Sequence, residues 1–74
     1  MKRPIVLVEW EDAAFTGGWH PKSVTTSQCT TVGYLIEKTK VQVVVALNGC
    51  EDGGFGEAMA IPRTCIRSIR RIRK

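Results

Sequence analysis

Two apolar-rich runs near the middle of the chain, residues 30–37 and 41–47, flank the polar tripeptide 38–40. Both runs are rich in β-branched and aromatic residues, which are enriched in strands. Two such runs joined by a short polar segment predict an antiparallel hairpin. Neither run has a fully polar face, so each strand is covered on both sides or bends. Gly33 lies inside the first run, and because a glycine within a strand often marks a sharp bend, we expect one there.

Three further segments combine apolar residues over strand-like lengths and predict additional strands. Pro62 ends the second of these segments, because a proline cannot donate a backbone hydrogen bond to a continuing strand. The turn that follows is short, since apolar residues resume at Ile66. We therefore predict a mainly β protein whose additional strands span residues 4–12, 57–61 and 66–71.

The last segment has a second interpretation. Ile66, Ile69 and Ile72 recur every three residues, which is typical of a short basic amphipathic helix. A strongly twisted strand can show the same spacing. The sequence leaves both structures open for residues 66–74.

Both faces of the predicted strands are apolar, and one of them is expected to form the core. A chain of 74 residues cannot easily leave the remaining apolar groups in water. We therefore expect a homo-oligomer, either a dimer or a ring. The expected core residues are Val32, Tyr34, Val43, Val45, Leu47, Ile61 and Ile66, and the apolar residues opposite them are Ile5, Leu7, Val44 and Ala46.

Two loops separate the predicted strands. Residues 13–28 form a long irregular segment after the first strand, and loops of this length are usually functional or disordered. Trp19, within this segment, either stacks on a base or folds back as a hydrophobic plug. Residues 48–57 contain four glycines. They predict a flexible hairpin loop rather than a phosphate-binding loop, because neither a lysine nor a helix start follows.

Positive charge is concentrated in the C-terminal segment. Residues 62–74 contain six basic and no acidic residues, giving +6, whereas residues 1–61 contain five basic and seven acidic residues, giving −2. The planar guanidinium of arginine suits phosphate well, so this segment is a candidate nucleic-acid-binding surface. A solvated tail that keeps the protein soluble is the alternative. The candidate binding residues are Arg63, Arg67, Arg70, Arg71 and Arg73, with Trp19 as a stacking residue.

Residues suited to catalysis, metal binding or export are few. His20 is the only histidine and no C-x-x-C pair occurs, so we expect no metal site and no cofactor. No catalytic constellation is recognisable, and we expect no enzymatic activity. Three widely spaced cysteines without a signal-peptide pattern favour a cytoplasmic protein. No stretch is long and apolar enough to cross a membrane.

The order of the predicted elements resembles the small five-stranded barrels of the SH3-like and Sm-like (Hfq-like) groups. In those barrels the second strand bends at a glycine and a single 3₁₀ turn joins the last two strands. Most of the chain, except residues 13–28, also resembles a group of small uncharacterised bacteriophage proteins. They share a tryptophan and an aspartate near the start, a Val-Gly-Tyr-Leu strand and a closing Ile-Pro segment. Here these are Trp10 and Asp12, Val32-Gly33-Tyr34-Leu35, and Ile61-Pro62 with Ile66 and Ile69.

The resemblance implies one domain over residues 1–74, a five-stranded SH3-like/Sm-like barrel with a long loop after the first strand. The nucleic-acid motifs of the Sm group are not matched residue by residue. We expect a small phage-type binding protein without catalytic activity. It would bind RNA or single-stranded DNA through its arginine-rich end, in the host cytoplasm if phage-encoded. The alternative is an oligomeric module that binds a host or phage protein, or a small nucleotide, through the loops around Trp19 and Gly53.

Overall fold

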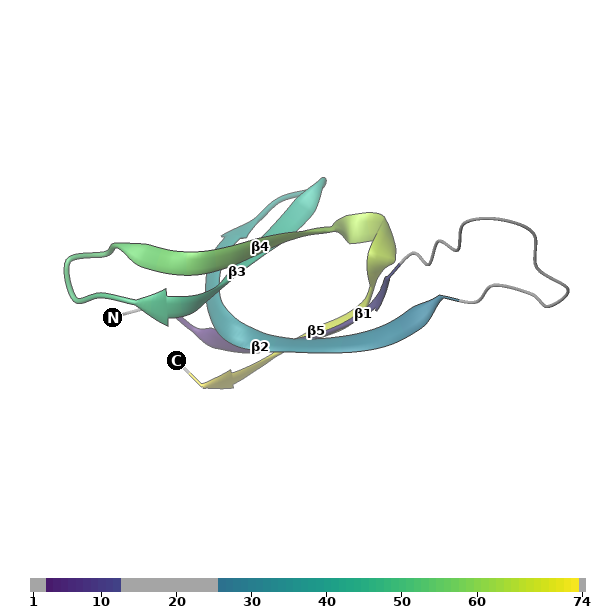
Figure 1. Ribbon diagram of the computed structural model, residues 1–74, viewed down its shortest axis with the longest axis horizontal. Coiled ribbons are helices and arrows are strands. Elements are labelled where there is room, and N and C mark those ends of the chain that lie inside the picture. The colour runs from purple at the N-terminus through teal and green to yellow at the C-terminus, as the bar shows by residue number, and fades with distance from the viewer. Residues whose placement is uncertain (1–2, 13–25, 74) are drawn as a thin grey trace, which may run out of the picture.

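The computed structural model describes residues 3–12 and 26–73, which contain five strands and one 3₁₀ turn (Figure 1). The predicted mainly β architecture is confirmed, and all five expected strands are present. The second begins three residues earlier than predicted, at Ser27, and the fourth begins two residues earlier, at Phe55. The elements are β1 (Ile5–Asp12), β2 (Ser27–Lys38), β3 (Gln42–Gly49), β4 (Phe55–Pro62), η1 (Arg63–Cys65) and β5 (Ile66–Arg73).

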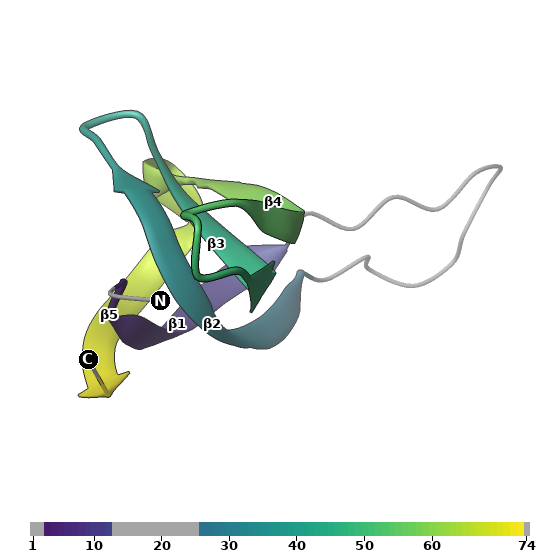
Figure 2. The same cartoon turned by 90° about the vertical axis from the view of Figure 1, so that its left-hand side faces the viewer.

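The strands form one antiparallel sheet in the order β4-β3-β2-β1-β5. The sheet curves strongly, and β2 crosses from one half of it to the other (Figure 2). β4 and β5 are joined by η1 but are not paired with each other, so the described strands do not close into a barrel. Each of these two strands therefore has one unpaired edge within the described part of the chain.

Gly33 allows β2 to change partners. β2 pairs with β1 through residues 27–34 and with β3 through residues 34–38. A Cβ atom on Gly33 would lie 2.5 Å from the carbonyl oxygen of Ala46 and 2.7 Å from Cγ1 of Val45. Only glycine fits this close approach of two strands without a shift. β2 thus changes partner next to Gly33, the position at which the sequence predicts a bend.

The core lies on the concave side of the curved sheet. Its fully buried members come from β1, β3 and β4, and none is more than 3% exposed. The indole nitrogen of Trp10 donates a hydrogen bond to the hydroxyl of Thr31 at 2.9 Å, so its polar group is satisfied beside the core. The predictions for Val43, Val45 and Ile61 are confirmed. The core cluster is Val6, Val8, Val43, Val45 and Ile61, with Trp10, Leu35, Cys65, Ile66 and Ile69 packed against it.

Two predicted core residues are exposed. Val32 is 46% exposed because it pairs with Leu7 on the convex face, away from Val6 and Val8. Leu47 is 67% exposed because it lies beyond Ala46, the last β3 residue that pairs with β2.

The remaining residues of both predicted sets are covered to different degrees. Ala46, predicted to lie opposite the core, is fully buried where β2 and β3 approach closely. The other residues predicted to lie opposite the core, Ile5, Leu7 and Val44, are half-buried. The predicted core residues Tyr34 and Ile66 are also half-buried.

The glycine-rich loop is shorter than the predicted 48–57 segment. β3 continues to Gly49 and β4 begins at Phe55, which leaves a five-residue connection between them. The amide of Cys50 donates to the carbonyl of Gly54 at 2.8 Å and closes this connection. Gly53 adopts a φ of 95°, a conformation that favours glycine, within the turn. The loop prediction was wrong in extent because β4 extends past Glu57 to Phe55, which pairs with Gly49 at the end of β3.

Candidate nucleic-acid interface

The basic C-terminal segment forms strand β5 rather than a helix. Ile66 and Ile69, three residues apart, would point to opposite faces of a regular strand. Their partners are nevertheless Trp10 and Val8, which both face the core. The register with β1 shifts between Glu9 and Trp10, so Arg67 is an extra residue on β5. This β-bulge returns Ile69 to the core face and explains the three-residue spacing.

A second register shift lies between Ile5 and Val6, and it leaves Ile72 without a partner on β1. Ile72 is 46% exposed. The two bulges decide which face of the sheet each arginine of β5 occupies.

All candidate arginines whose side chains the structure describes are exposed. Arg63 opens η1, and its amide donates to the carbonyl of Val41 at 2.9 Å. Arg73 belongs to β5 opposite Ile5, and its side chain lies outside the described part. Trp19, the predicted stacking residue, also lies outside the described residues. The exposed candidates are Arg63, Arg67, Arg70 and Arg71.

Arg70 and Arg71 lie on opposite faces of the sheet. Arg70 pairs with Leu7 on the convex face, and Arg71 pairs with Val6 on the core face. In a regular strand the side chains of Arg67 and Ser68 would point to opposite faces, but in β5 they do not. The bulge places both side chains against partners on the convex face, Gln28 for Arg67 and Glu9 for Ser68.

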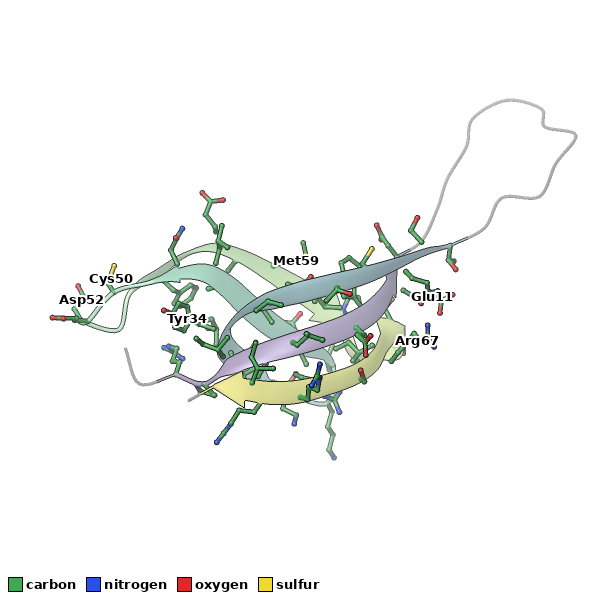
Figure 3. All side chains as sticks on the ribbon, turned by 90° about the horizontal axis from the view of Figure 1, so that it is seen from below. Glu11, Tyr34, Cys50, Asp52, Met59 and Arg67 are labelled. Carbon is green, nitrogen blue, oxygen red and sulfur yellow. The ribbon has the colours of Figure 1, made fainter. Side chains whose placement is uncertain are left out.

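Acidic side chains offset part of the positive charge near Arg67. Ser68 donates a hydrogen bond to the carboxylate of Glu9 at 2.7 Å. Arg67 donates from Nη1 to the side-chain oxygen of Gln28, whose cross-strand partner is Glu11. Figure 3 shows Arg67 and Glu11 at the same end of the molecule. Repulsion between these carboxylates and a phosphate is expected to weaken a contact at Arg67 more than one at Arg70, whose cross-strand partner is the apolar Leu7.

Sequence reasoning missed a second basic group near the interface. The guanidinium carbon of Arg3 lies 5.8 Å from the centroid of the Phe55 ring. Nη1 of Arg3 also donates to the carbonyl of Ile36 at 3.3 Å, which fixes the guanidinium against β2. The sequence pattern places Phe55 in the glycine-rich loop, since glycines and Glu57 surround it. Its place in β4 follows from pairing with Gly49 of β3, which the local sequence does not signal.

The described residues offer no metal centre. Within residues 3–12 and 26–73, no three side chains of His, Cys, Asp or Glu are grouped closely enough to hold a metal ion. Cys29, Cys50 and Cys65 are all free thiols. The same residues contain no helix that is long and apolar enough to cross a membrane.

Fold and site together define a small, mainly antiparallel β protein with an arginine-rich sheet edge. Comparison of the chain with protein-family models, curated proteins and solved structures finds no match. Its function is therefore inferred from its own residues.

Proposed function

We propose that this protein binds single-stranded RNA or DNA through β5 and η1, without catalytic activity. The observation that supports this proposal is a sheet edge with three exposed arginine side chains and a fourth in the preceding turn η1, within a segment that contains no acid. Arginine contacts phosphate through a rigid, planar set of donors. Phosphate contacts carry no sequence information, so binding is weak and independent of base sequence.

An edge strand suits an extended ligand. Successive residues of a strand are about 3.3 Å apart, so β5, residues 66–73, spans at most roughly 23 Å. Single-stranded nucleic acid follows grooves and edges of this length through its phosphates. Arg70 and Arg71 on opposite faces allow the ligand to follow the edge itself rather than one face.

We propose that the fold belongs to the SH3-like/Sm-like group, of the bacteriophage type, with the sheet open between β4 and β5 in the described part of the chain, and that the protein works in the cytoplasm. The partner change of β2 at Gly33 and the 3₁₀ turn before β5 support this class. The free cysteines are compatible with a reducing compartment.

The alternative function, a module that binds a host or phage protein, is favoured by a different observation. Leu47, Phe55 and Met59 are 67%, 46% and 45% exposed on the β3–β4 hairpin. Exposed apolar groups gathered on neighbouring strands are typical of protein contacts. Both this alternative and self-association would use the hairpin, and they leave β5 free.

Salt dependence tests the nucleic-acid proposal. With four phosphates neutralised, the slope of log affinity against log salt is about −3 for a single strand. Fluorescence anisotropy with labelled oligonucleotides of different sequences measures both the slope and the lack of base preference. The charge-matched variants are Arg67→Gln with Arg70→Gln on β5, and Lys38→Gln with Lys40→Gln at the β2–β3 turn. This turn adjoins Arg63 of η1, but its strands do not pair with β5.

The arginine variant is expected to lower the magnitude of the slope by about 1.4, since each single-strand phosphate contact contributes about 0.7. The lysine variant keeps the wild-type slope, although it removes the same net charge. Equal losses in both variants would attribute binding to net charge alone. A wild-type protein that binds no oligonucleotide at low salt rejects the proposal.

A further inference from the structure

The Arg3–Phe55 pair lies close to the end of the arginine-rich edge. The register between β1 and β5 places Ile5 opposite Arg73, and Arg3 precedes Ile5 by two residues. Two residues of extended chain span about 7 Å. The start of β1, the end of β5 and the β3–β4 connection lie at the same end of the molecule (Figure 1). The basic groups of β5 therefore continue toward the Arg3–Phe55 pair.

The ring of Phe55 is open to a ligand. It is 46% exposed, and its cross-strand partner is Gly49, which has no side chain to cover it. The Arg3 guanidinium is within cation–π range at 5.8 Å and is anchored on the Ile36 carbonyl. An aromatic ring beside an ordered cation is a suitable site for a nucleobase, because stacking on aromatic side chains tolerates every base.

Acidic residues limit the ligand on the other side of Phe55. Glu51 and Asp52 are exposed in the adjoining turn, where the Asp52 carboxylate accepts the amide of Gly54 at 2.8 Å. Their negative charge repels a phosphate chain. A bound strand would therefore end near Phe55 instead of continuing over the turn.

We propose that Phe55, with Arg3 beside it, stacks one unpaired base of the single strand whose phosphates lie along β5. This inference rests on the proposed nucleic-acid-binding function and adds a base contact to it. The contact is independent of base identity, and it distinguishes a nucleic acid from a simple polyanion.

The stacking contact is isolated by removing the aromatic ring from the protein and, separately, the bases from the ligand. Wild type and Phe55→Leu are each titrated with an oligothymidylate and with an abasic oligonucleotide of equal phosphate number. Wild type is expected to prefer the base-bearing strand, and Phe55→Leu is expected to lower that preference about tenfold, the value of one stacked base. Abasic binding and the salt slope stay unchanged, because no phosphate contact is removed. Met59→Leu, on the same strand and 45% exposed, is the control and keeps the wild-type preference.

Three results would overturn the inference, and they have different meanings. If Phe55→Leu binds both strands as wild type does, no base stacks on Phe55. If it instead changes the sedimentation of the protein and leaves the base preference intact, the Arg3–Phe55 pair is a protein contact. If wild type binds neither strand, the proposed function itself fails. Circular dichroism of each variant confirms that the fold is retained.

Discussion

At the scale of single residues, Gly33 has closer neighbours than Gly53, Gly54 or Gly56. A side chain at this position would meet a backbone oxygen on β3 and a methyl group of the buried Val45. The backbone oxygen belongs to a paired strand, so it has little freedom to move away. Gly56, by contrast, has no atom within 4 Å of the place where its Cβ would lie.

Gly33→Ala is expected to lower the free energy of unfolding by about 3 kcal/mol, as overpacking of a close contact does. Gly56→Ala is the matched control and should change it by less than about 0.5 kcal/mol. Urea denaturation followed by circular dichroism measures both values. Equal stability of the two variants would show that β2 and β3 can separate at Gly33 without cost.

At the scale of elements, strand positions were predictable from the sequence but strand faces were only partly so. Hydrophobic alternation and turn residues identified all five strands, because these signals are local. The exposure of Val32 and Leu47 depends on where β2 leaves one neighbour and meets another. That change of partner is a property of the folded sheet, and the pattern of apolar and polar residues along one strand does not predict it.

The candidate site shows the same limit. The sequence identified its arginines from charge alone, and the structure shows that four of them are exposed. Their division between two faces follows from the bulge at Arg67, which depends on pairing with β1. The Arg3–Phe55 pair joins residues 52 positions apart, and only the folded chain brings such residues together.

At the scale of the whole molecule, the unpaired edge of β4 and the exposed side chain of Leu47 on the β3–β4 hairpin favour self-association. Unpaired edges can extend a sheet into a neighbouring molecule, and exposed apolar groups are covered when they do. We expect a homo-oligomer, detected by analytical ultracentrifugation at tens of micromolar protein.

Leu47→Lys should shift the protein toward the monomer, because a charge on this 67% exposed residue opposes apolar contact. Val41→Lys is the matched control, since Val41 is 74% exposed just before the start of β3, at the other end of the hairpin, and should leave assembly unchanged. A wild-type protein that sediments as a monomer would contradict this expectation.

The strand order also has a consequence for how the chain folds. Three of the described pairings join strands that follow one another in sequence, and each can form as a local hairpin. β1 and β5 are far apart in sequence, and the hydrogen bond from Ser68 to Glu9 spans 59 positions. Closing so long a segment costs more chain entropy than closing a hairpin, so β5 is expected to join the sheet last and to detach first.

Native-state hydrogen exchange measures this order directly. The β5 amides that bond to β1 should exchange faster than the β3 amides, because the free energy of opening is smaller for β5. β3 has a partner strand on each side, whereas β5 has one. Equal protection of the two strands would mean that the sheet opens as one unit. If β5 does open first, the edge proposed to bind nucleic acid is also the part of the fold that a bound strand would stabilise most.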